Sequence, residues 1–341
     1  MPSAVRTVAT VLVGAATAAA HGIVLGVFGP DNEFHQGWDS REMGYDGNYP
    51  DVIGWSTTER EEGFVSKEDY STPDIICHRG AKPATLSVEV AAGDVVTLEW
   101  DDWPQDHHGP VMDYLAPCGG GGCAKVDKES LEFFKISEVG CEKPGMGDDG
   151  VWATDLLIDN DFKWQVMIPE GLAPGEYVLR HEILALHEPG QPQHYPQCVN
   201  IKVTGGDGGN GVDGVDGEDE VPAGIPATEL YEDYEDFDIY APFDSYPIPG
   251  PAMIAGASPI LHQGTGKPDV PAGRIEGATG DYYEGTPLLA TSTVETGAAE
   301  TAGPEATGPP EVPELEDPAE PTAPSTGGNG GSCLARRKVA A

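Results

Sequence analysis

Short segments in which apolar and polar residues alternate recur through the first two thirds of the chain, and this feature most constrains the fold. The alternation over residues 85–90, 95–100, 164–168, 177–183 and 199–203 is typical of strands with one buried face. Gly, Pro, Asn or Asp interrupts the chain between such segments, and long helical periods are absent. We therefore predict an all-β domain, an immunoglobulin- or fibronectin-like antiparallel β-sandwich with long loops.

The first twenty residues are typical of a secretory signal peptide. Arg6 precedes a run from Val8 to Ala20 that is apolar or small at nearly every position and too short to span a bilayer. The alternative is an N-terminal helix of the domain, but the small-residue run ends abruptly at a polar, turn-rich segment. We expect a secreted, extracellular protein without a membrane partner, and cleavage that makes His21 the first mature residue.

An N-terminal His21 would offer two nitrogens to a metal from one residue, its α-amine and its imidazole. An unperturbed α-amine has a pKa of roughly 7.7–8.0, so a soft divalent metal displaces its proton readily. His107 and His108 lie in a loop after the predicted strand that ends at Trp100. A loop histidine is usually only a solvated side chain, but here His21 is a candidate partner. Two imidazoles and one amine suit copper better than zinc or magnesium.

Six cysteines remain after the leader, and an even number in an oxidising compartment indicates disulfides. Counting alone does not give the pairing. Cys118 and Cys123 are separated by four glycines, a spacing short and flexible enough for a local bridge. A zinc site would need a second Cys or His pair at similar spacing, and the sequence shows none. The other cysteines are Cys77, Cys141, Cys198 and Cys333.

The formal net charge of −40 is concentrated in residues 21–255, which hold 46 of the 58 acidic residues. Such a surface repels nucleic acid and anionic membranes, and it favours a neutral substrate or a cationic partner. Residues 256–341 contain 11 prolines and only two aromatic residues, so we expect a disordered tail there. The predicted organisation is a signal peptide at 1–20, a catalytic domain at 21–255 and a tail at 256–341 that is either a tether or dispensable.

Four motifs occur in order along the domain: His21 itself, His-x-Gly-Pro-Val-x-x-Tyr at 107–114, a strand-like stretch at 177–187 and Gln-x-Tyr-Pro-Gln-Cys at 193–198. Together they resemble the fungal lytic polysaccharide monooxygenases of auxiliary-activity family 9, formerly glycoside hydrolase family 61. The resemblance runs from His21 to about Ala255. It implies the same β-sandwich that the alternating segments predict.

The resemblance also implies a copper site. It places one copper ion on the amine and one ring nitrogen of His21 and on one ring nitrogen of His107, with Tyr195 in the axial position. In the family pattern the ligand precedes the glycine by two positions, which selects His107 over His108. The sequence by itself leaves that choice open.

Further roles follow from the same resemblance. His181 and Gln193 fall on positions that hydrogen-bond an oxygen species beside the metal, although the interval between them is shorter than usual. Together with Tyr195 they form the predicted catalytic set. Tyr246 is the candidate for stacking on a sugar ring. The implied disulfides are Cys77–Cys198 and Cys118–Cys123, which leave the pairing of Cys141 and Cys333 open.

The implied activity is oxidative cleavage of β-1,4-glucan, above all cellulose, at C1 and/or C4. It uses hydrogen peroxide or dioxygen and an electron donor such as cellobiose dehydrogenase, and the enzyme is expected to be a monomer. A glycoside hydrolase with an acid/base carboxylate pair is a rival, since an acidic chain does not exclude it. Another rival is a non-catalytic copper- or carbohydrate-binding protein on the same scaffold. Oxidised products distinguish the monooxygenase from both.

Overall fold

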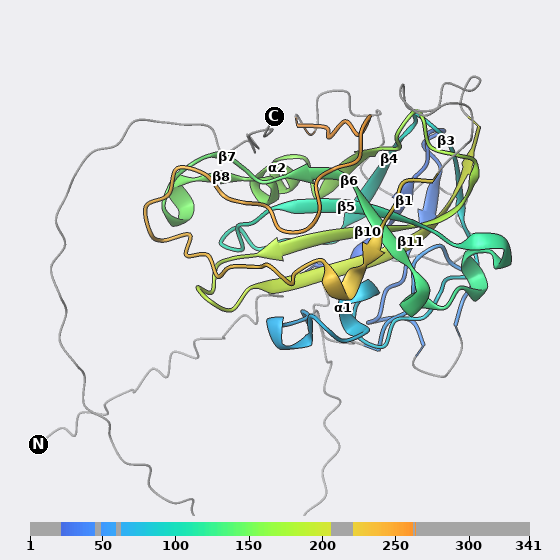
Figure 1. Ribbon diagram of the computed structural model, residues 1–341, viewed down its shortest axis with the longest axis horizontal. Coiled ribbons are helices and arrows are strands. Elements are labelled where there is room, and N and C mark those ends of the chain that lie inside the picture. The colour runs from blue at the N-terminus through green and yellow to red at the C-terminus, as the bar shows by residue number, and fades with distance from the viewer. Residues whose placement is uncertain (1–21, 45–48, 59–62, 206–220, 262, 264–341) are drawn as a thin grey trace, which may run out of the picture. The chain divides into compact units, whose positions relative to one another are not determined.

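Two β-sheets pack face to face, which confirms the predicted β-sandwich. The computed structural model describes residues 22–44, 49–58, 63–205, 221–261 and 263 (Figure 1). One sheet has the order β2-β1-β4-β9, formed by Phe34–Gln36, Val24–Phe28, Val95–Trp100 and Lys163–Met167. The larger has the order β12-β6-β5-β10-β11-β3, formed by Ile225–Pro226, Glu132–Val139, Val111–Pro117, Gly175–Ala185, Gln193–Thr204 and Val88–Ala91. A small third sheet pairs β7 (Cys141–Lys143) with β8 (Val151–Trp152).

Helices are short in the described part of the chain. The two α-helices are α1 (Asp74–Cys77) and α2 (Ala153–Asp159). The Asp155 side chain caps α2 by accepting a hydrogen bond from the Trp152 backbone N–H at 2.6 Å. Single 3₁₀ turns occur at Lys67–Asp69, Gly119–Gly121, Cys123–Lys125, Lys128–Ser130, Gly147–Asp149 and Ala227–Glu229.

The predicted strands all occur, with small shifts at their ends. The segment 95–100 is β4 itself, and the segments at 177–183 and 199–203 lie within the longer β10 and β11. The strand predicted at 85–90 begins later, at Val88. Its pairing also departs from a purely antiparallel sandwich, because β3 runs parallel to β11 at the sheet edge.

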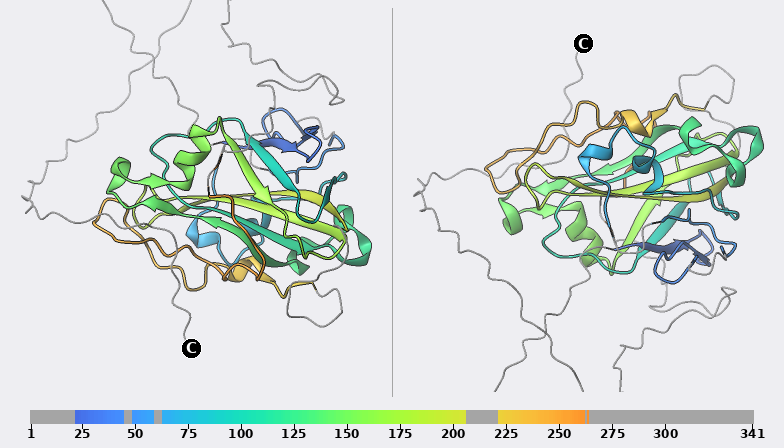
Figure 2. Two further views of the ribbon diagram at one scale, coloured as in Figure 1. Left: turned by 90° about the horizontal axis from the view of Figure 1, so that it is seen from above. Right: turned by 90° about the horizontal axis from the view of Figure 1, so that it is seen from below.

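The larger sheet is buried on both faces, and this determines where its side chains can act. Along β10, Leu179 and Ile183 face the core between the sheets, whereas Val178 and Leu184 face a second apolar layer. That layer contains α1 and much of the segment 221–261, which lies on the opposite side of the sheet from β1 (Figure 2). The aromatic segment after 230 therefore packs on the sandwich, as its composition indicates.

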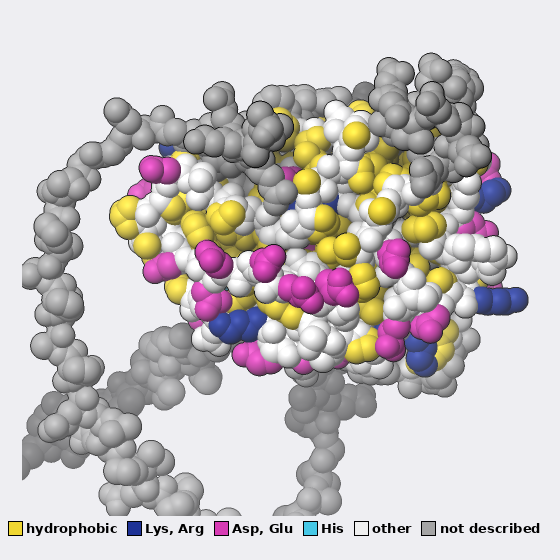
Figure 3. Space-filling model, in the orientation of Figure 1, with side chains coloured by type: hydrophobic (Ala, Val, Ile, Leu, Met, Phe, Trp, Pro, Cys, Tyr) yellow, Lys and Arg dark blue, Asp and Glu magenta, His cyan; other side chains and the backbone are white. Residues whose placement is uncertain are grey.

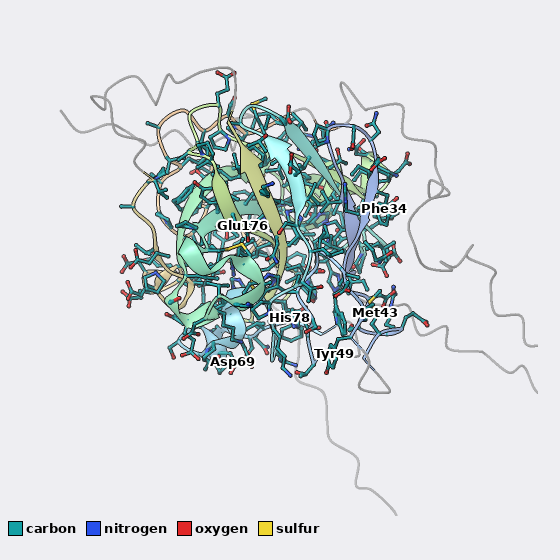
Figure 4. The ribbon with its side chains drawn as sticks, turned by 90° about the vertical axis from the view of Figure 1, so that its right-hand side faces the viewer. Phe34, Met43, Tyr49, Asp69, His78 and Glu176 are labelled. Carbon is teal, nitrogen blue, oxygen red and sulfur yellow. A yellow bond between two sulfur atoms is a disulfide. The ribbon has the colours of Figure 1, made fainter. Side chains whose placement is uncertain are left out.

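Both predicted disulfides are present. Cys77 at the end of α1 bonds Cys198 in β11, and Cys118 bonds Cys123. Glu176 accepts a hydrogen bond from the Cys123 backbone N–H at 2.8 Å, and a disulfide lies beside it in Figure 4. Cys141 is buried and its thiol contacts the Lys143 carbonyl at 3.1 Å, while Cys333 lies outside the described residues.

Among the described helices, none has the length and apolar character needed to cross a membrane. The predicted signal peptide and nearly all of the predicted tail fall outside the described residues.

Candidate active site

His107 lies in the loop between β4 and β5 and is held there by its backbone. Its N–H donates to the Pro104 carbonyl at 3.2 Å, and its own carbonyl accepts a hydrogen bond from the Trp103 indole at 2.9 Å. Its side chain is mostly buried, with 8% exposed. These bonds fix the backbone position from which the imidazole projects.

The glycine of the His-x-Gly-Pro motif allows this loop to press against the end of β10. A Cβ on Gly109 would lie 1.8 Å from the Leu184 carbonyl oxygen, far inside van der Waals contact. On either side of it the Leu184 N–H donates to Pro110 and the Leu186 N–H donates to His108, at 3.1 and 2.9 Å. The motif therefore joins the loop to the end of β10 through two backbone hydrogen bonds that flank Gly109. We call this junction the splice.

This splice brings His107 onto His187, which follows the end of β10. The two imidazole rings stack with 3.6 Å between centroids and 24° between planes. On its other side, His107 Nδ1 lies 2.8 Å from the Asp106 carboxylate. The hydrogen bond from His107 lowers the pKa of Asp106, because it stabilises the charged carboxylate.

His108 has different surroundings. Its Nε2 lies 3.1 Å from Asp148 Oδ1 and its Nδ1 lies 3.1 Å from Asp155 Oδ1. Burial alone would lower the pKa of His108, but these two carboxylates raise it above its ordinary value. Both ring nitrogens of His108 therefore lie beside carboxylates. For His107, the Asp106 carboxylate lies beside Nδ1.

Tyr195 and Gln193 are alternate residues of β11 and point to the same side of the strand. The Tyr195 hydroxyl donates to Gln193 Oε1 at 2.7 Å, and burial raises the pKa of this phenol. Trp103 packs edge-on against Tyr195, with 5.0 Å between ring centroids, and also contacts the His107 ring at 6.1 Å. The structure thus brings His107 and Tyr195 together around Trp103.

The start of the described chain lies at the same place. A Cβ on Gly22 would lie 1.9 Å from the Asp102 carbonyl oxygen, so only glycine fits there. The Ile23 N–H donates to Asp101 Oδ1 at 2.7 Å. Gly22 and Tyr195 line one small cavity of about 40 Å³. His21, the predicted N-terminal ligand, precedes Gly22 and lies outside the described residues.

The structure does not support the role predicted for His181. This residue is fully buried between the sheets, where its Nδ1 lies 2.6 Å from Asp113 Oδ1 and its Nε2 accepts from the Trp100 indole at 3.0 Å. Both ring nitrogens are therefore engaged by core residues. The histidine that lies beside His107 is His187.

His187 was missed because the sequence pattern does not show where β10 ends. Residues within a strand buried on both faces point into the core, but a residue past its end can reach the rim of the sandwich. β10 ends at Ala185, and His187 is half-buried while His181 is fully buried. Both histidines occur in the 177–187 motif, and the usable signal was the nearness of His187 to the polar turn at 188–192.

The prediction for Tyr246 is wrong. Its side chain is only 2% exposed and packs against Trp152 and Phe237, so it cannot stack on a sugar. The exposed aromatic residue near the site is Tyr240, with 49% of its surface accessible. Its hydroxyl donates to the His187 carbonyl at 3.2 Å, which places it beside the stacked histidines.

The fold and the site together define a β-sandwich protein in which histidine, tyrosine and glutamine side chains lie together at one end of the sheets. Comparison with known proteins makes the class specific. The sequence model of Auxiliary Activity family 9 (formerly GH61) matches residues 21–243, and the chain belongs to this family. It is therefore an oxidative enzyme of a copper-dependent family, the lytic polysaccharide monooxygenases.

Individual relatives agree with this assignment. Lytic polysaccharide monooxygenase D of Podospora anserina is 45% identical over 261 residues, which are 75% of this chain and 72% of the relative. Monooxygenase E of Aspergillus tamarii is 46% identical over 74% of this chain and 98% of its own length. The extended catalytic domain of Hypocrea jecorina LPMO9A superimposes with a TM-score of 0.62 and 40% identity, covering 70% of this chain and 92% of that domain.

Proposed function

We propose that this chain is a secreted monooxygenase that binds one copper ion and oxidatively cleaves β-1,4-glucan, with cellulose as its main substrate. Attack falls at C1 and/or C4, with hydrogen peroxide or dioxygen as the oxidant. The observation that carries the proposal is that Trp103 contacts both His107 and Tyr195, with His187 stacked on His107 and Gln193 hydrogen-bonded to Tyr195. Gly22, where the described chain begins, lines a cavity with Tyr195. Family membership supports the reaction class, and the substrate and position of attack are our proposal.

The donor chemistry fits copper. Asp106 lies at Nδ1 of His107, so we assign Nε2 as the ring nitrogen that would bind the metal. We assign the amine and imidazole of His21 as the other nitrogens, since Gly22 is anchored next to Asp102 and shares a cavity with Tyr195. Imidazole and amine donors are a set that Cu(II) binds well. When bound, copper supplies the electron transfer and oxidant activation that no side chain can supply.

The protein's own residues position the groups around the metal and supply hydrogen-bond donors to them. Tyr195 presents its hydroxyl as a neutral donor, because burial raises its pKa, and Gln193 fixes the direction of that hydroxyl. We assign to His187 the hydrogen-bonding role beside the metal that the motif had suggested for His181. Its stack on His107 fixes the ring orientation of both histidines. The Trp103 side chain and the sandwich core border the site on the side that faces the protein interior. They exclude water from that side of the site.

Tyr240 is our candidate for contact with the polysaccharide. It is the exposed aromatic ring beside His187, and a flat ring of this kind stacks well on the apolar face of a pyranose. Burial and the nearby carboxylates of Asp148 and Asp106 raise the pKa of Tyr240, so it stays neutral at working pH. The acidic surface suits a neutral glucan, because such a substrate carries no charge to be repelled.

We further propose that residues 1–20 are removed on secretion, that residues 21–255 form the catalytic domain and that residues 256–341 form a tail. The working state in this proposal is a monomer. A small reductant or an electron-donor protein such as cellobiose dehydrogenase reduces the copper. These statements rest on the sequence and on the resemblance of the whole domain.

Mass spectrometry of the products from cellulose, with copper and ascorbate, tests the proposal. We expect oxidised oligosaccharides from the parent enzyme and none from His107→Ala. His35→Ala is the matched control. His35 lies in β2 and, with Asp31 and Glu33 from the turn before it, forms a separate described group that could hold a metal. Copper titration followed by electron paramagnetic resonance should give one ion per chain for the parent and the control.

Two outcomes would contradict the proposal. Equal oxidised products from His107→Ala and the parent would remove His107 from the site. Copper binding without oxidised products would favour a non-catalytic copper protein, and products with ordinary reducing ends would favour a hydrolase. A form that keeps one residue before His21 should fold but lose most copper affinity, because the amine ligand is then an amide.

A further inference from the structure

An acidic groove crosses the outer face of the larger sheet, away from the residues assigned to copper. It has a volume of about 490 Å³ and lies between the segment 225–235 and the segment 247–251. These two segments belong to the layer that covers the sheet, and Figure 3 shows acidic side chains across this face. Its carboxylates come from Glu229, Glu232, Asp233 and Glu235.

The negative charge of this groove is not balanced locally. None of the described residues that line it is basic, and none of its four carboxylates forms an ion pair within the described part of the chain. Lys135 lies close behind the wall, where it donates to the Pro249 carbonyl at 2.6 Å, but it is fully buried and already paired with Glu138 at 2.8 Å. An occupant with several positive charges would therefore be attracted.

The groove also has an apolar base. Leu230 is 3% exposed, and the partly buried Ile225 and Ile248 pack on the same core layer. Pro247, Pro249 and Pro251 stiffen one wall. A fitting occupant is thus a short peptide that combines adjacent basic residues with aliphatic ones.

We infer that this groove binds the chain's own segment Leu334–Val339. It contains Arg336, Arg337 and Lys338, and nowhere else in the sequence are two Lys or Arg residues adjacent. Leu334 and Val339 flank these charges with the aliphatic side chains that the groove base would contact. The segment lies outside the described residues.

The length of the intervening chain permits this docking. About seventy residues separate Gln263 from Arg336, and a chain of that length spans on the order of 200 Å when extended. Attachment to the same molecule gives the basic segment an effective concentration that can approach the millimolar range. A charge-driven contact that would be weak between separate molecules therefore becomes populated within one chain.

Zero-length carbodiimide crosslinking of the intact mature chain tests the inference, because it joins an amine only to a carboxylate in contact with it. We expect Lys338 to be joined mainly to Glu232, Asp233 or Glu235. The yield should be unchanged on dilution of the protein. It should fall about tenfold in roughly 1 M salt, where the screening length drops to about 3 Å.

Matched variants make the result specific. E232Q/D233N/E235Q should abolish the groove crosslinks, whereas E33Q/E129Q/E170Q, with the same change in net charge, should leave them intact. In hydrogen–deuterium exchange, R336E/R337E/K338E should speed up exchange at 229–235 relative to the parent. Crosslinks spread evenly over exposed carboxylates, or unchanged exchange, would overturn the inference. A yield that falls with dilution would also overturn it, because the occupant would then be a second copy.

Discussion

His187 stacks on His107 with 3.6 Å between ring centroids, although the two residues come from different elements and are 80 positions apart. The stack depends on the splice at Gly109, which fixes the loop of His107 against the end of β10. Because His187 is half-buried and follows the end of β10, we expect it to contribute to the site more than to the core. This separates it from His181, with which it shares a motif.

We expect His187→Ala to lower the rate of oxidised product formation about 10- to 100-fold, the usual effect of removing a residue that orients a metal ligand. Its melting temperature should change little, since His187 is only half-buried. His187→Gln, which keeps a hydrogen-bonding group, should recover part of the rate. Product quantification and calorimetry check both points, and an unchanged rate would remove His187 from the mechanism.

His181→Ala should give the opposite profile. It would remove the acceptor of the Trp100 indole N–H and leave the buried Asp113 carboxylate with the Trp164 indole as its remaining side-chain partner among the described residues, a loss of about 3–5 kcal/mol of stability. Denaturant unfolding should show this loss directly. If His181→Ala were as stable as the parent but inactive, the original assignment of His181 would be restored.

Tyr240 at the site and Tyr246 in the outer apolar layer offer a second contrast. Tyr240→Ala should weaken binding to cellulose several-fold with no large change in melting temperature, because Tyr240 is exposed. Tyr246→Ala should cost about 3–5 kcal/mol through loss of core packing. Tyr246→Phe should keep full activity and stability, since the buried Tyr246 hydroxyl has no hydrogen-bond partner among the described residues. Pull-down on microcrystalline cellulose and thermal unfolding measure these effects.

A buried ion pair on the outer face of β10 sets the expected acid sensitivity. Burial alone would raise the pKa of Glu182, but Arg180 and His194 outweigh it and lower that pKa to about 2. Arg180 lies 2.5 Å from the Glu182 carboxylate, and Tyr231 also donates to it. In the unfolded chain this carboxyl should titrate near its ordinary value of about 4.3.

The sign of the effect follows from this difference. A carboxyl with a depressed pKa in the folded state stabilises the fold above its unfolded pKa, and this contribution is lost as pH falls toward its folded pKa. We expect the free energy of unfolding to drop by a few kcal/mol between about pH 4.5 and pH 2. Glu182→Gln should be less stable at neutral pH and should show a flatter dependence in this window. An equal slope in both proteins would contradict the assignment.

The strands could be predicted from the sequence because each carries its own alternation, as the match of 95–100 to β4 shows. The proposed copper ligand was harder to choose, since His107 and His108 are chemically alike and only the family pattern favours His107 in the sequence. In the structure their surroundings separate them, because carboxylates lie at both ring nitrogens of His108 while the His107 ring stacks on His187. The role of His187 depends on where β10 ends. The role of Tyr240 depends on which of the aromatic side chains after residue 230 are buried in the core. Those facts arise from packing between distant segments, and the polar turn that follows His187 is only a weak local signal for them.

The close approach of Gly109 to β10 should matter for both the fold and the site. Gly109→Ala should destabilise the fold by about 1–3 kcal/mol or more, because its Cβ would meet the rigid Leu184 carbonyl at 1.8 Å and the backbone must shift. The shift would displace His107 from His187, so copper affinity should fall along with stability. Gly120→Ala is the matched control, since no atom lies within 4 Å of the added methyl there. Unfolding and copper titration of both variants test the point, and a Gly109→Ala enzyme with parental affinity would show that the close approach to β10 does not set the geometry of the site.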